Sequence, residues 1–129
     1  MELELIKTFI EYHLDMTRRI WESIREITEE QFLADDAYSR GSIRNLMVHL
    51  SSTDRRWLAG LKNLADYSST LTEVDLNSPN DKVAEPRWQV ILHIINHGTD
   101  HRSTVLQRLH EFGAPTFDQD FIMWLWSKK

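Results

Sequence analysis

The sequence predicts an all-α protein, built as a helical bundle of up to four main helices with a short C-terminal helix. Three long stretches carry apolar side chains at three- and four-residue steps, which is the spacing of one helix face. Residues that favour turns gather between these stretches, and the whole chain holds four glycines and three prolines. Because 129 residues suffice for one hydrophobic core, we expect a single domain over residues 1–129.

The first predicted helix runs from Leu3 to Ile27. Its apolar positions recur at helical spacing; they are Leu5, Phe9, Met16, Ile20, Ile24 and Ile27. His13 lies on the same helix, and we interpret it as a partly buried or surface histidine. Thr28 follows, with Gln31 three residues later, which is the pattern of a capped short turn of helix.

The second predicted helix runs from about Ile43 to Leu64. A connection rich in Asp, Ser and Gly precedes it, and Ser42 is placed to cap its first turn. Its apolar face consists of Ile43, Leu46, Met47, Leu50, Trp57, Leu58 and Leu61. His49 lies near the middle of this helix, whereas we interpret residues 54–56 (Asp-Arg-Arg) as a solvated turn.

Residues 66–85 form the least regular stretch and predict a connection with at most one short helical turn. Pro86 suits the first turn of a long third helix. That helix ends at Gly113, a residue type common just past helix C-termini, and Pro115 blocks its continuation.

The C-terminal run FDQDFIMWLWSKK predicts a short, very apolar helix over residues 121–126. Asp118 or a neighbouring residue is expected to cap it. So much aromatic surface is costly to leave in water, so this helix must pack against the body of the protein or against a partner.

The third helix carries the strongest chemical signal, the pair His97 and His101. Residues four apart lie one above the other on a helix, so two imidazoles at this spacing can reach one metal ion. Such pairs also occur by chance on surface helices. His93 extends the series, but its Cα lies about 12 Å from that of His101 at a rise of roughly 1.5 Å per residue. We therefore keep His97 and His101, assign His93 a boundary or surface role, and expect a third ligand from another segment.

Composition and charge exclude several classes of function. A net charge of −5 provides no basic surface for nucleic acid. The chain has no cysteine, so it can form no disulfide and offer no thiolate, and a metal would be held by imidazole, carboxylate or water. No long apolar run and no leader-like N-terminus occurs, so we expect no membrane span and a cytoplasmic protein.

Two blocks of the chain resemble the DinB/YfiT-like family of metal-dependent enzymes. The blocks are GSIRNLMVHLSSTDRRWL and EPRWQVILHIINHGTDHRSTVLQRLHEFGAP, followed by DFIMWL. The resemblance implies a four-helix bundle and three metal ligands that map onto His49, His97 and His101. Zinc is the expected ion and nickel the next candidate.

The chain departs from the family pattern at two places. Ser103 stands where the family usually has glycine after the His-Arg pair, which should alter only local packing. Family members also carry a full helix between the two histidine blocks, where this chain has only the stretch from Asp66 to Glu85. The shortened segment would leave an apolar groove open, so we expect the C-terminal helix or a second copy of the chain to fill it, and we favour a homodimer.

The resemblance implies activation of a low-molecular-weight thiol toward a small-molecule substrate, as in a thiol-dependent S-transferase. Metal-dependent hydrolysis with water as nucleophile is one alternative. A non-catalytic metal-binding or dimerisation module is the other. We interpret Arg102 as a surface residue in a salt bridge, with anchoring of an anionic substrate as its functional alternative.

Overall fold

The computed structural model describes residues 2–61 and 87–129, and within these ranges it is entirely helical, without strands. The helices are α1 (Glu2–Ile24), α2 (Glu29–Leu33), α3 (Ile43–Leu61), α4 (Arg87–Glu111) and α5 (Phe121–Trp126). The predicted all-α class is therefore confirmed. The predicted connection at 66–85 and Pro86 lie outside the described residues. None of the described helices is long and apolar enough to cross a membrane.

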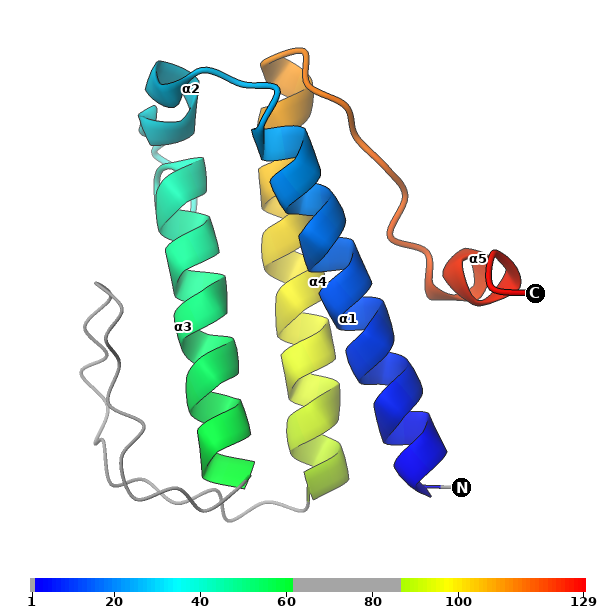
Figure 1. Ribbon diagram of the computed structural model, residues 1–129. Coiled ribbons are helices and arrows are strands. Elements are labelled where there is room, and N and C mark those ends of the chain that lie inside the picture. Colours follow the sequence, from blue (N-terminus) through cyan, green and yellow to red (C-terminus); the bar gives the residue numbers. More distant parts are fainter. Residues whose placement is uncertain (1, 62–86) are drawn as a thin grey trace.

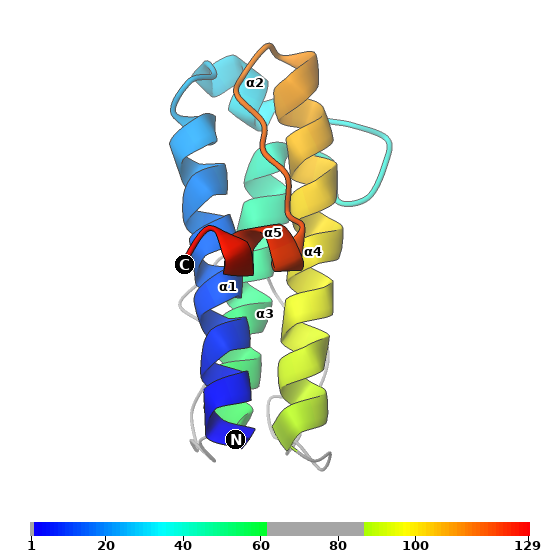
Figure 2. The same ribbon diagram turned by 90° about the vertical axis from the view of Figure 1, so that its right-hand side faces the viewer.

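Three long helices form the body of the molecule, and α4 packs against both α1 and α3. α1 and α4 run in the same direction, and α3 runs opposite to both (Figure 1). The short helix α5 lies across α1 and α4 near the middle of their length (Figure 2). This arrangement makes α4 the central element, with one face toward α1 and another toward α3.

The helix ends follow the local sequence signals closely. Thr28 and Gln31 form the expected capping box at α2, and the Ser42 hydroxyl accepts a hydrogen bond from the backbone N–H of Asn45 at the start of α3 (3.1 Å). Asp120 caps α5 by accepting from two backbone N–H groups. Gly113 adopts a positive φ of 77° just after α4, a conformation that favours glycine.

The core consists of two apolar clusters separated along the bundle. The first cluster joins Tyr12, Met16, Val90, Ile91, Ile94, Ile95 and Trp124. The second joins Ile20, Ile43, Leu46, Met47, Val105, Leu109 and Ala114. On α4 the two sets are separated by residues 97–102, which are mostly polar. A polar layer therefore crosses the middle of the bundle.

The C-terminal helix α5 packs against the body of the protein, which is one of the two arrangements expected from its apolar sequence. The Phe121 ring stacks on Phe9 with centroids 4.9 Å apart and meets Tyr12 edge-on at 5.1 Å. The Trp124 indole N–H donates to Asp15 Oδ2 (2.8 Å). Because α5 crosses α1 instead of lying along it, it covers only part of that helix.

Candidate metal centre

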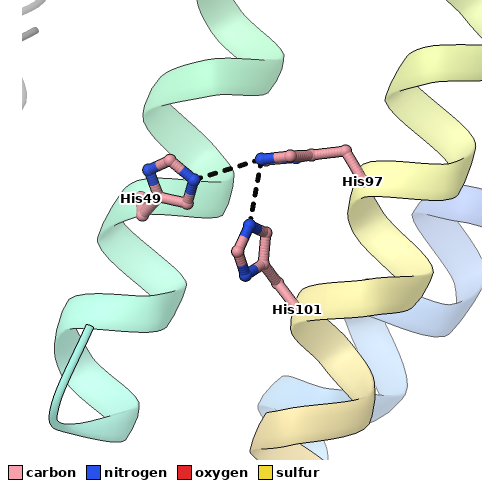
Figure 3. Close-up of side chains that lie close together, drawn as sticks. All are labelled: His49, His97 and His101. Atoms are coloured by element: carbon pink, nitrogen blue, oxygen red, sulfur yellow. Dashed lines mark hydrogen bonds between the residues drawn. The ribbon is translucent and has the colours of Figure 1, made fainter. Parts of the chain in front are cut away.

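Three histidines converge between α3 and α4 in the polar layer. His97 and His101 project from successive turns of α4, and His49 projects toward them from the middle of α3 (Figure 3). The Nε2 atom of His97 lies 3.1 Å from that of His49 and 3.0 Å from that of His101. Among the described residues, these three form the one group of ligand-bearing side chains close enough to share a metal ion.

The spacing of these nitrogens fits a shared divalent ion. With metal–nitrogen bonds of about 2.1 Å, two bound nitrogens are about 3.0 Å apart at a right angle and about 3.4 Å apart at the tetrahedral angle. The two separations around His97 therefore match neighbouring positions around one ion. The set offers three imidazole nitrogens as ligands, which suit zinc, nickel and similar metals.

The protonation chemistry of the cluster also favours a cation at its centre. In a neutral imidazole the Nε2 atom carries either one proton or one lone pair, and in His97 this single group faces two nitrogen neighbours. Burial, together with the neighbouring His101 and His49, lowers the pKa of His97 to about 3. His97 therefore stays neutral near pH 7, which is the state that binds a metal. Its Nδ1 is buried without a partner among the described residues.

His93 lies one turn before this cluster and outside it. Its ring centroid is 5.5 Å from that of His97 and 4.9 Å from that of Trp57. His93 is exposed, whereas His97 and His101 are half-buried and His49 is buried. The structure thus places the exposed His93 imidazole between the Trp57 ring and His97 of the three-histidine cluster.

The opposite face of α4 carries a buried guanidinium, which corrects our interpretation of Arg102 as a surface residue. Arg102 is 0% exposed. Its Nε donates to Gln119 Oε1 (2.7 Å), and its Nη1 donates to His13 Nδ1 (2.9 Å) and to Thr17 Oγ1 (3.2 Å). Burial lowers the pKa of Arg102, while Tyr12 and Asp54 act in the opposite direction.

His13 connects this guanidinium to a carboxylate on α3. Because arginine can only donate, the Nδ1 of His13 must accept, so the proton of this imidazole resides on Nε2. That Nε2 donates to Asp54 Oδ2 at 2.6 Å. Asp54 is therefore a bonded, mostly buried carboxylate, and the interpretation of its helical turn as solvated is wrong for this residue.

Gly98 allows α1 and α4 to approach closely at this layer. A Cβ at this position would lie 2.4 Å from Cε1 of His13 and 2.7 Å from Nη1 of Arg102. Real Cβ atoms essentially never show such short separations. The His13 ring therefore occupies the space that any larger residue at position 98 would need.

Sequence reasoning missed His13, Gly98 and Arg102 as one unit, although Gly98 and Arg102 each carried a faint signal. A glycine inside a long helix costs about 1 kcal/mol relative to alanine, so it indicates a packing requirement. Arg102 follows Gly98 by four residues, which places both on one face of α4. These signals alone do not identify His13 as the residue that meets that face.

A comparison with models of protein families finds one family that the chain matches. The model of the DinB family matches residues 1–85, about two thirds of the sequence. The matched region contains His49 and ends before His97 and His101. No curated protein and no solved structure matches the chain. Since the family model covers more than half of the sequence and the described residues form a helical bundle, the chain belongs to the DinB family.

Proposed function

We propose that this protein is a metal-dependent enzyme in which His49, His97 and His101 hold one divalent ion through their Nε2 atoms. One observation carries the proposal: three imidazole nitrogens from two helices meet at separations of about 3 Å around His97. Zinc is the favoured ion and nickel the next, because both accept imidazole ligands readily.

The same site supports activation of a small-molecule thiol. A divalent ion held by three neutral imidazoles keeps its positive charge and an open position, and it lowers the pKa of a bound thiol or water toward neutrality. The chain has no cysteine of its own, so the thiol comes from a low-molecular-weight cofactor. A thiol-dependent S-transferase activity follows from this chemistry.

Two observations favour this function over the alternatives. The convergent group in the described part of the chain consists of three imidazoles and includes no carboxylate. The C-terminal aromatic residues pack on Phe9 and Tyr12, at α1, so they do not close the three-histidine cluster as a purely structural metal site would require. His97 and His101 keep part of their surface exposed.

The test begins with metal analysis of the purified protein. We expect about one equivalent of zinc or nickel per chain. The protein is then assayed for conjugation of small thiols to a chromogenic electrophile, with and without chelator. A metal-bound protein that conjugates thiols until the chelator is added supports the transferase. A metal-bound protein with no such activity, or with chelator-sensitive ester or amide hydrolysis instead, contradicts it.

We also propose that the chain forms a homodimer. On α1, Leu3, Leu14 and Trp21 are 74%, 59% and 41% exposed. At about 100° per residue they share one face, which lies away from the buried side chains Met16 and Ile20. Apolar surface left in water costs about 25 cal/mol per Å². A symmetric copy that offers the same row is the commonest way for a soluble protein to cover such a face.

Light scattering at low micromolar concentration tests the dimer. The expected mass is twice the 15.3 kDa of the chain, and Leu14→Glu should shift it to that of one chain. A wild-type monomer that unfolds cooperatively and binds no dye for exposed apolar surface would contradict the proposal.

A further inference from the structure

A continuous row of hydrogen bonds links the two helices that carry the three-histidine cluster. It starts at Arg102 on α4, passes through His13 on α1 and ends at Asp54 on α3. Arg102 directly follows His101, and Asp54 lies five residues after His49. The row therefore connects α3 to α4 by a path through the bundle interior, separate from the histidine cluster itself.

Two members of this row, His13 and Arg102, are buried, and the side chain of the third, Asp54, is 19% exposed. His13 is 2% exposed and Arg102 is 0% exposed. A neutral His13 accepts from the guanidinium at Nδ1 and donates to the carboxylate at Nε2, so it bridges one positive and one negative charge. Loss of either contact leaves a buried charge with fewer partners, which is costly. The row thus resists any change in the separation of α3 and α4 at this level.

We propose that Asp54, His13 and Arg102 are positioning residues for the three-histidine centre: they set the spacing between α3 and α4 at which His49 meets His97 and His101. This inference rests on the proposed metal-binding function and deepens it. The three-histidine set depends on that spacing because His49 alone comes from α3. A small shift between the helices would separate its Nε2 from the other two. No residue of the row belongs to the three-histidine set itself.

Cobalt(II) is a suitable probe, because its visible absorption reports both binding and the geometry around the ion. Asp54→Leu and His13→Phe each remove the link between α1 and α3. We expect both to weaken Co(II) binding on the order of tenfold, the lower range for residues that orient ligands indirectly. Their Co(II) spectra should also differ from that of the wild type. Asp54→Asn keeps an oxygen acceptor for His13 Nε2, so it should restore the wild-type spectrum and most of the affinity.

Ser23→Ala is the matched control. Ser23 is also a buried polar residue of α1, and its hydroxyl donates to the Pro115 carbonyl instead of linking α1 to α3. It should lower the stability of the metal-free chain while leaving Co(II) affinity and spectrum unchanged. Circular dichroism of each variant, before titration, restricts the comparison to folded protein.

The outcomes separate this inference from the function on which it rests. If the wild type binds no stoichiometric Co(II), the metal-binding function fails and the positioning role fails with it. If the wild type binds Co(II), and folded Asp54→Leu and His13→Phe match its affinity and spectrum, the row is merely structural and only this inference is overturned. If one of these two variants does not fold, the comparison of the remaining variant with Asp54→Asn decides the result.

Discussion

The two faces of α4 use neighbouring residues for opposite purposes. His97 and His101 face α3, whereas Gly98 and Arg102, each one residue further along, face α1. On the α1 side, the guanidinium finds acceptors on His13, Thr17 and Gln119. On the α3 side, the Nε2 atoms of His49 and His101 lie 3.1 Å and 3.0 Å from that of His97, at the spacing of neighbouring ligands around one ion.

This difference distinguishes a structural polar layer from a binding site. Buried polar groups that serve only the fold are normally paired, as the Arg102 guanidinium is with His13, Thr17 and Gln119. The three histidines instead bring one ring nitrogen each close enough to one another to share a metal ion.

The largest effect should come from removing a histidine on the α3 side. His49→Ala and His101→Ala each take away one of three ligands, so we expect metal content to fall to near zero after dialysis, a loss of at least 100-fold in affinity. Metal analysis and a chelator competition titration measure this loss.

His93→Ala is the control for these variants, because its ring lies beside His97 without joining the cluster. It should leave the metal content nearly unchanged. If His93→Ala removes the metal while His97→Ala does not, the ligand assignment is wrong.

The next effect should appear on the α1 side as a loss of stability. Arg102→Met keeps a long side chain but removes the donors to His13 and Gln119. Breaking a buried charge network by deleting one partner costs about 3–5 kcal/mol. Urea unfolding of the metal-free protein should show this decrease. Arg18→Ala removes an exposed arginine that pairs with Asp15, and it should lower the stability far less, because solvent screens such surface pairs. Equal losses of stability for the two variants would show that the buried Arg102 contributes no more to folding than an exposed arginine does.

A smaller loss is expected when the close approach of α1 and α4 is obstructed. Gly98→Ala places a methyl group 2.4 Å from the His13 ring. Overpacking costs about 1–3 kcal/mol, and alanine returns up to about 1 kcal/mol through its better helix propensity. Thermal unfolding should therefore show a net destabilisation.

Gly113→Ala serves as the comparison, because a Cβ at Gly113 meets nothing within 4 Å and the substitution tests only the positive φ of 77°. It should cost about 1 kcal/mol and leave metal binding intact. An unchanged or stabilised Gly98→Ala protein would show that His13 does not need this space.

The smallest effect concerns pH. Burial lowers the pKa of His97 to about 3, against about 6.5 in an unfolded chain. Between these values the unfolded state binds more protons, so the stability of the metal-free protein should fall as pH drops below about 6.5. The slope is a fraction of the one-proton value of about 1.4 kcal/mol per pH unit, since His97 is only partly buried. Urea midpoints from pH 7.5 to 5 measure it, and His97→Gln should flatten the curve.

Metal binding should weaken over the same range, because imidazoles bind metal only when neutral. Metal occupancy at limiting concentration that stays constant from pH 7.5 to 5 would make histidine ligation untenable.

The helices and the histidine pair could be predicted because their signals are local. The spacing of apolar residues marks α1, α3 and α4, and the caps at Thr28 and Ser42 depend on neighbours three residues away. Likewise, His97 and His101 share a face by their spacing alone. The burial of Arg102 could not be predicted from local signals, because its partners come from α1 and from the C-terminal segment. The nearby residues Asp100 and Ser103 are exposed, so the local sequence around Arg102 resembles that around a surface residue.

The long separation of the interacting residues has a consequence for how the protein folds. His13 and Arg102 are 89 residues apart in sequence, and His13 and Asp54 are 41 residues apart. Helical proteins usually fold fast because most of their contacts are local. Here α1 must meet both α3 and α4 before the polar layer can form. Closing the long loops between these helices costs entropy before any contact repays that cost. The polar layer should therefore assemble late, after the individual helices.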